Sequence, residues 1–79
     1  MRPIAELISK LQWDSKEHPE EYSFFYIDRI ENAYKEIRYS DIIRKEGRHL
    51  MLNPNGEEVE IPLHRIMLVK KRGWTIWRR

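Results

Sequence analysis

The spacing of the hydrophobic residues changes at Tyr22, and this change limits the fold more than any other feature of the sequence. Before it, apolar side chains recur at intervals of three and four residues, which is the spacing of one helical face: Ile4, Leu7, Ile8 and Leu11. From Tyr22 the apolar residues alternate, as they do in a β-strand. The pattern predicts a helix over about residues 3–13 and antiparallel strands over about residues 22–78, joined by a mobile polar loop over about residues 14–21.

Turn-forming residues divide the second part of the chain into short strands. The strongest turn pattern is Asn53-Pro54-Asn55-Gly56, which has proline at its second position and glycine at its fourth. Weaker turn patterns occur at Asn32, at residues 45–47 and at residues 70–73. The predicted strands lie between these breaks, at residues 22–30, 34–39, 48–52, 57–61, 66–69 and 74–78.

These elements predict an α+β fold. The N-terminal helix should pack on a bent antiparallel sheet or small open barrel of about six short strands. The strand that begins at Tyr22 is apolar on both faces, so we expect it to lie in the centre of the sheet. Ser40 can cap a single helical turn that ends near Ile43. The three tryptophans are large enough that we expect most of their area to close the core: Trp13, Trp74 and Trp77.

Composition excludes several classes of protein. A chain of 79 residues forms a single domain, residues 1–79. The absence of cysteine excludes disulfide scaffolds, cysteine-based zinc sites and thiol nucleophiles. With 35% charged residues and a mean hydropathy of −0.78, no segment approaches the ~20 apolar residues of a membrane span. We expect a cytoplasmic protein. We also expect no cofactor and no metal site, because there is no glycine-rich phosphate loop and no metal-ligand spacing of histidines.

Charge is distributed unevenly along the chain. Residues 1–63 carry 9 Lys and Arg against 13 Asp and Glu, a balance of −4, whereas residues 64–79 carry 6 Lys and Arg and no acid, which together give the net charge of +2. An acidic body with a basic C-terminal hairpin predicts a local anion site. The alternative is that these cations protect a sheet edge from aggregation.

The tract from Ile61 to Ile66 is the most informative candidate site. Pro62 should fix a turn between two strands, and the apolar residues around it should anchor that turn in the core. His64 and Arg65 would then lie on a rigid corner, where an imidazole and a guanidinium fork suit a phosphate. The alternative is structural: His64 bonds a backbone carbonyl and Arg65 pairs with an acid such as Asp28.

A second group of candidates lies near the ends of two other strands. Arg29 and Arg78 could add phosphate contacts. Asp28 could support them by holding a basic side chain in place, and Trp77 could support them by stacking on an unpaired nucleotide. The alternatives are a structural ion pair for Asp28, a solvated side chain for Arg29 and ordinary core packing for Trp77. Arg78 and Arg79 also lie at the end of the chain, where residues often fray.

Four tracts occur in an order that resembles one known family. They are Met1-Arg2-Pro3-Ile4 before a helix that ends in Trp13-Asp14, then Tyr26–Arg29, Ile61–Ile66 and Trp77–Arg79. The sequence is similar to a small, mostly archaeal family that was formerly uncharacterised, the RNA cyclic group end recognition domain. The resemblance implies a non-catalytic module that recognises RNA 3′ ends with a 2′,3′-cyclic phosphate, in RNA repair or processing. It also implies that His64 and Arg65 match the polar corner of the family, and Asp28 and Arg29 its strand pair.

Three functional hypotheses stay open at this level. The first is the RNA-end binder, and the second is a protein–protein adaptor that docks a larger RNA-processing enzyme. The third and weakest is a small phosphodiesterase that uses His64 and His49 as an acid–base pair.

Overall fold

A computed structural model describes residues 3–53 and 56–79 of the chain. Within these residues, one α-helix precedes seven strands, and three short 3₁₀ turns lie between them. The elements are α1 (Ile4–Trp13), η1 (Pro19–Glu21), β1 (Tyr22–Asp28), β2 (Ala33–Arg38), η2 (Tyr39–Asp41), β3 (Ile42–Glu46), β4 (His49–Leu52), β5 (Val59–Pro62), η3 (Leu63–Arg65), β6 (Ile66–Lys71) and β7 (Trp74–Arg78). The α+β class predicted from the sequence is confirmed.

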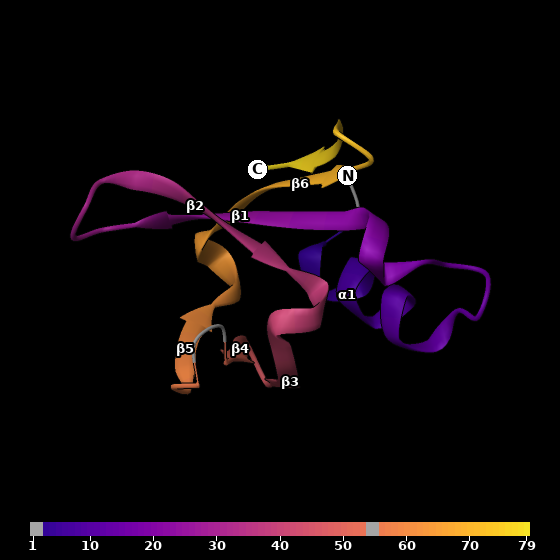
Figure 1. The fold of residues 1–79 in the computed structure, drawn as a ribbon, viewed down its shortest axis with the longest axis horizontal. Coiled ribbons are helices and arrows are strands. Elements are labelled where there is room, and N and C mark those ends of the chain that lie inside the picture. The colour runs from indigo at the N-terminus through magenta and orange to yellow at the C-terminus, as the bar shows by residue number, and fades with distance from the viewer. Residues whose placement is uncertain (1–2, 54–55) are drawn as a thin grey trace.

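The strands form two antiparallel sheets. One has four strands in the order β2-β1-β6-β7, and the other has three in the order β3-β4-β5. In Figure 1 the strands β3, β4 and β5 lie on the opposite side of the molecule from β6 and β7. The strand β3 was missing from the prediction, which gave a helical turn up to Ile43. The turn ends at Asp41 instead, because the β-branched residues Ile42 and Ile43 favour a strand.

The central position predicted for β1 is confirmed, because β1 pairs with β2 on one side and with β6 on the other. Its register defines two faces of the four-stranded sheet. We call the face that carries Phe24 the inner face; Phe24 lies opposite Ile37 of β2 and Val69 of β6, and Val69 lies opposite Trp77 of β7. All four of these side chains are buried.

The core forms between this inner face, α1 and the smaller sheet. The predicted apolar stripe of the helix is buried throughout. The buried cluster consists of Ile4, Leu7, Ile8, Leu11, Tyr22, Phe24, Ile37, Leu50, Leu52, Ile61, Leu63, Ile66, Val69 and Trp77. Every element type therefore contributes to one continuous core, and the corner at Leu63 is part of it.

Two of the three tryptophans do not lie where we expected. Trp77 is 8% exposed, but Trp13 is 85% exposed and Trp74 is 78% exposed. Trp13 follows Leu11 by two positions, which places it about 200° around the helix and away from the apolar stripe. Trp74 directly follows the two-residue turn at Arg72 and Gly73, at the start of the edge strand β7.

The connections agree with the predicted turns where the structure describes them. Arg72 (φ 52°) and Gly73 (φ 85°) form the two-residue connection of β6 and β7, and positive φ at both positions is the geometry that matches the twist of a hairpin. The turn predicted at residues 53–56 includes positions 54 and 55, which lie outside the described residues. Pro62 was expected to stop its strand, and it is the last residue of β5, opposite His49.

Candidate functional site

The predicted corner exists and is held rigidly. η3 begins directly after Pro62 and joins the smaller sheet to β6. The backbone N–H of Leu63 donates to the carbonyl of Arg48 at 2.8 Å, and the Leu63 side chain is buried. His64, the next residue, is exposed. A buried anchor followed by an exposed imidazole is the arrangement that the sequence predicted for this tract.

Arg79 fixes the corner from the other side. Its backbone N–H donates to the carbonyl of Met67 at 3.0 Å, so it continues the pairing of β7 with β6. Its Nε donates to the carbonyl of Ile66 and its Nη2 to the carbonyl of Leu63, both at 3.1 Å. The guanidinium carbon also lies 5.3 Å from the centre of the Trp77 ring. These contacts bind only part of the guanidinium, and the remaining N–H groups can donate to a ligand.

A hollow of about 480 Å³ opens beside this corner. We call it the corner hollow, and it is lined by Pro3, Ile4, Ala5, Arg48, Leu63, His64, Trp77 and Arg79. Three of these side chains can carry positive charge, and no acidic side chain lines the hollow among the described residues. Its volume lies within the usual range of small-ligand sites. The corner hollow therefore combines an apolar floor with a positive rim.

The start of α1 adds further donors to the corner hollow. The first intrahelical hydrogen bonds run from the N–H groups of Glu6 and Leu7 to the carbonyl of Pro3. The N–H groups of Ile4 and Ala5 precede these bonds, and no side chain caps the helix at Pro3. The positive end of a helix dipole favours an anion.

The predicted candidates are only partly brought together. His64 and Trp77 line the corner hollow, but Arg65 does not. The Arg65 Nε is buried and has no hydrogen-bond partner among the described residues. The guanidinium that accompanies His64 is therefore that of Arg79, and not that of the sequence neighbour Arg65. Arg29 is exposed beyond the end of β1 and lies outside the hollow.

Asp28 has a local structural role. Its Oδ1 accepts hydrogen bonds from the N–H groups of Ile30 and Glu31, and its Oδ2 lies 3.2 Å from Lys35 Nζ. The Glu31 N–H and the Lys35 ammonium lower the pKa of Asp28, and the Asp28 carboxylate in turn raises the pKa of Lys35. Asp28 therefore shapes the β1–β2 turn, and its basic partner is Lys35 and not Arg65.

Arg78 lies next to the corner hollow but not in it. It lines a second hollow of about 440 Å³, which we call the edge hollow, together with Thr75, Ile76 and Trp77. Sequence reasoning favoured Arg78 and missed Arg79. The signal was present, because residues two apart on a strand share a face, so Arg79 lies on the same side as the buried Trp77. Arg48 carried no comparable signal, since only the Leu63–Arg48 backbone contact places it there.

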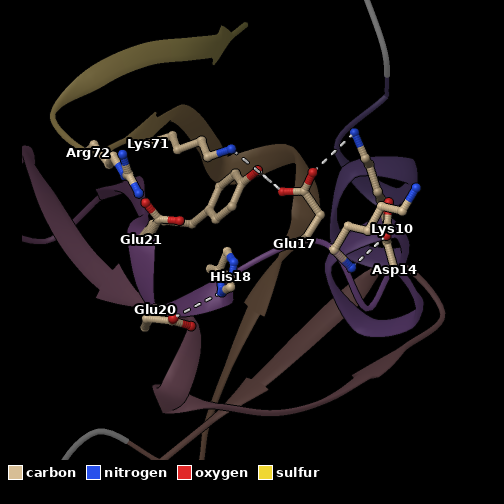
Figure 2. Close-up of polar contacts among 10 residues, drawn as sticks. Lys10, Asp14, Glu17, His18, Glu20, Glu21, Lys71 and Arg72 are labelled. Carbon is tan, nitrogen blue, oxygen red and sulfur yellow. Dashed lines mark hydrogen bonds and ion pairs between the residues drawn. The ribbon is translucent and has the colours of Figure 1, made fainter.

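The opposite end of the β6–β7 hairpin has a different character. Figure 2 shows Glu17 between Lys10 and Lys71, and the ion-pair distances are 3.5 Å and 3.8 Å. Glu21 pairs with Arg72 in the same region (Figure 2). The loop that we expected to be mobile therefore supplies acids that fix and neutralise the turn of the basic hairpin.

Tyr22 is part of this acidic cluster. Its hydroxyl donates a hydrogen bond to the Glu17 carboxylate. Burial and then this hydrogen bond raise the pKa of Tyr22 to about 12. The same hydrogen bond is the main reason that the pKa of Glu17 lies below its usual value. The acids of this cluster pair with the cations around them, so its positive charge is largely neutralised.

Three further features bear on the kind of site: metal ligands, a second imidazole and a membrane-spanning helix. Among residues 3–53 and 56–79, no group of three or more His, Asp or Glu side chains is arranged to hold a metal ion. His49, the second imidazole of the phosphodiesterase hypothesis, lies 3.4 Å from Glu60 and is not in the lining of the corner hollow. No helix in the described part of the chain has the length and apolar content that crossing a bilayer requires.

The fold and the hollow together define a small α+β domain with a cation-rimmed hollow suited to an anion. The chain belongs to the MJ1316 RNA cyclic group end recognition domain family, whose profile matches residues 1–79. It is 32% identical over 79 residues to the UPF0248 protein YG5714_2801 of Saccharolobus islandicus, covering 96% of this chain and 98% of that protein. It is 28% identical over 76 residues to a UPF0248 protein of Metallosphaera sedula, covering 96% and 91%. No solved structure matches this chain.

Proposed function

We propose that this protein recognises RNA ends that carry a 2′,3′-cyclic phosphate, without cleaving them, and that the corner hollow holds the terminal phosphate. The observation that carries the proposal is the convergence of Arg48, His64 and Arg79 on one hollow whose described lining has no acid. The family name points to the same ligand class. This assignment keeps His64 from the sequence-based site and replaces Arg65 with Arg79.

The chemistry of the hollow suits such an end. A cyclic phosphate is a monoanion, and an arginine fork together with an imidazole N–H can donate to its two non-bridging oxygens. The apolar floor at Leu63 and Trp77 can hold the ribose and the base, which a phosphate-only site would not need. A single anion subsite gives weak binding alone, since strong nucleic-acid binding takes many phosphate contacts.

The other two hypotheses have less support. A His-dependent phosphodiesterase needs a second proton-transfer group near His64, but His49 lies beside Glu60 and is not in the described lining of the corner hollow. A protein–protein adaptor that docks an RNA-processing enzyme has only exposed apolar side chains such as Trp13 in its favour. We therefore rank the non-catalytic RNA-end binder first.

The experiment compares short RNAs that differ only in their 3′ end, measured by fluorescence anisotropy with the full chain. We expect the 2′,3′-cyclic phosphate to bind at least tenfold more tightly than the 3′-hydroxyl. The substitutions His64→Ala and Arg48→Ala should each remove most of this preference, because each loses a charge-assisted contact worth about 1.5–3 kcal/mol.

Arg72→Ala is the matched control, since it removes an exposed arginine that Glu21 already neutralises. It should leave the preference unchanged. Circular dichroism checks that all three variants are folded. Equal affinity for both RNA ends in the unmodified protein would exclude the proposal, and cleavage of the cyclic phosphate would favour the phosphodiesterase.

A further inference from the structure

The four-stranded sheet has a second face that no part of the core uses. We call it the outer face. Across its first row, Glu36 of β2 lies opposite Phe25 of β1, Phe25 lies opposite Leu68 of β6, and Leu68 lies opposite Arg78 of β7. In the next row, Arg38, Ser23, Lys70 and Thr75 lie side by side in the same way. Among the described residues of β1, β2, β6 and β7, all buried side chains lie on the inner face of the sheet.

The outer face carries an excess of positive charge. Three cations lie in these two rows, against the single acid Glu36: Arg38, Lys70 and Arg78. They come from three different strands, so the charge spreads across the sheet and does not form one local pair. Such a distribution is complementary to a polyanion that crosses the strands, and it is unlike the neutralised turn at Arg72.

The same face offers apolar and aromatic side chains between the cations. Phe25 and Leu68 are partly exposed in the first row, and Tyr34, which lies opposite Ile27 one row further on, is 60% exposed. The Lys70 ammonium lies 5.4 Å from the centre of the Phe25 ring. A cation beside an aromatic ring is the combination that one unpaired nucleotide needs, because its phosphate requires a charge and its base requires a flat surface.

The outer face is continuous with the corner hollow. Trp77 lines both the corner hollow and the edge hollow. Arg79 lines the corner hollow, and the preceding residue, Arg78, lines the edge hollow. Arg78 is also the last residue in the first row of the outer face. A chain that leaves the corner hollow across β7 therefore meets positive charge at each step.

We propose that the outer face binds the unpaired nucleotides that precede the RNA end, as a second subsite for single-stranded RNA. This inference rests on the proposed function for the identity of the ligand, but not for the site itself. The phosphates contact Arg78, Lys70 and Arg38 in turn, and the bases lie against Phe25 and Tyr34. Affinity then depends on RNA length, whereas the corner hollow alone would respond only to the end.

The test uses the full chain and two unstructured RNAs of roughly two and ten nucleotides, each with a 3′-hydroxyl or a 2′,3′-cyclic phosphate. We expect the longer RNA to bind at least tenfold more tightly than the shorter one with either end. In the double variant Arg38→Ala, Lys70→Ala this gain should fall at least fivefold. The slope of log affinity against log salt should decrease by about 1.4, since each lost single-strand phosphate contact contributes about 0.7.

Two matched variants sharpen the test. Glu36→Ala removes the one acid from these rows and should increase affinity for the longer RNA two- to threefold. Lys16→Ala and Lys45→Ala together remove two cations from other parts of the surface and should change it less than twofold. All substituted side chains are exposed or partly exposed, and circular dichroism confirms the folded state.

The outcomes separate this inference from the proposed function. Affinity that does not depend on RNA length, or a length gain that survives the double variant, overturns the second subsite even if the cyclic phosphate is still preferred. A length gain that the double variant removes supports the second subsite even if both RNA ends bind equally. Protein capture through this face without any RNA affinity would also overturn the inference.

Discussion

The two ends of the β6–β7 hairpin carry similar residues and differ in what surrounds them. At the turn end, Lys71 and Arg72 face the acids of the loop before β1, and Glu17 and Glu21 neutralise them (Figure 2). At the other end, Arg79 meets backbone carbonyls and the Trp77 ring. The positive charge is therefore satisfied at the turn end and available at the hollow end.

This difference explains why a charge count along the chain is insufficient to locate a site. Residues 64–79 have no acid, yet two of their six cations, Lys71 and Arg72, pair with acids that lie about 50 positions earlier in the chain. Only the fold decides which cations remain free for a ligand. The contrast between the two ends predicts differences in stability and in the pKa of Tyr22 that can be measured.

The largest difference is expected between the tryptophans of the two ends. Trp77→Ala removes a side chain that is 8% exposed, which should lower the free energy of unfolding by about 3–5 kcal/mol. Trp74→Ala removes one that is 78% exposed, and this change should stay within about 0.5 kcal/mol. Urea denaturation followed by circular dichroism measures both. Equal losses would mean that the hollow end is not part of the core.

The second prediction concerns the two consecutive arginines at the hollow end. Arg79→Lys keeps the positive charge but loses the fork that reaches the carbonyls of Leu63 and Ile66 at once. We expect a loss of about 1–2 kcal/mol in the free energy of unfolding. Arg78→Lys is the matched control, because Arg78 is exposed and should lose less than about 0.5 kcal/mol. If the two variants unfold alike, Arg79 does not hold the corner.

These two residues also show what the sequence could and could not predict. Period-two alternation located β1, β2, β4, β5, β6 and β7 to within a few residues, because each strand has a buried face. The same alternation places Arg79 on the side of Trp77, although the sequence analysis favoured Arg78. The prediction that Trp13 is buried was wrong, because it was based on the size of the side chain. The position of a residue relative to the apolar stripe, and not its volume, decides whether it faces the core.

Tertiary placement was beyond any local pattern. Arg65 follows His64 in the sequence, but its Nε is buried, while Arg48 comes from the turn between β3 and β4. The pairing of Glu17 with Lys71 joins segments that no periodicity connects. The fold class could therefore be predicted from the alternation of apolar residues, whereas the composition of the hollow depends on contacts between distant segments.

The third prediction concerns the hydrogen bond that the Tyr22 hydroxyl donates to Glu17 at the turn end. Glu17→Gln should lower the pKa of Tyr22 from about 12, but leave it above 10, because burial is the larger cause of the shift. Nuclear magnetic resonance of labelled tyrosine rings across this range measures the change. A Tyr22 pKa that the substitution leaves unchanged would contradict the hydrogen bond.

The same pair predicts how stability depends on pH. Between about pH 10 and 12 the unfolded chain loses the Tyr22 proton before the folded protein does, so stability should decrease as the pH rises through this window. In acid, the group that matters is Glu17, whose pKa is lower in the folded protein than its usual value of 4.5. Glu17 therefore contributes to the free energy of unfolding above pH 4.5, and this contribution is lost as the pH falls further. Glu17→Gln should reduce both slopes, and unchanged slopes would assign them to other groups.

The smallest effect is expected at Arg72, although its contact with Glu21 joins distant parts of the chain. Arg72 is 74% exposed, and an ion pair at such a surface contributes only about 0.2–1 kcal/mol. Arg72→Ala should therefore shift the midpoint of thermal unfolding by at most about 4–8 °C in a domain of this size. The backbone N–H of Arg72 also donates to the Glu21 carbonyl at 3.0 Å, and this bond survives the substitution. A larger loss than in Arg79→Lys would reverse the contrast, because the turn end would then be the more strongly coupled of the two.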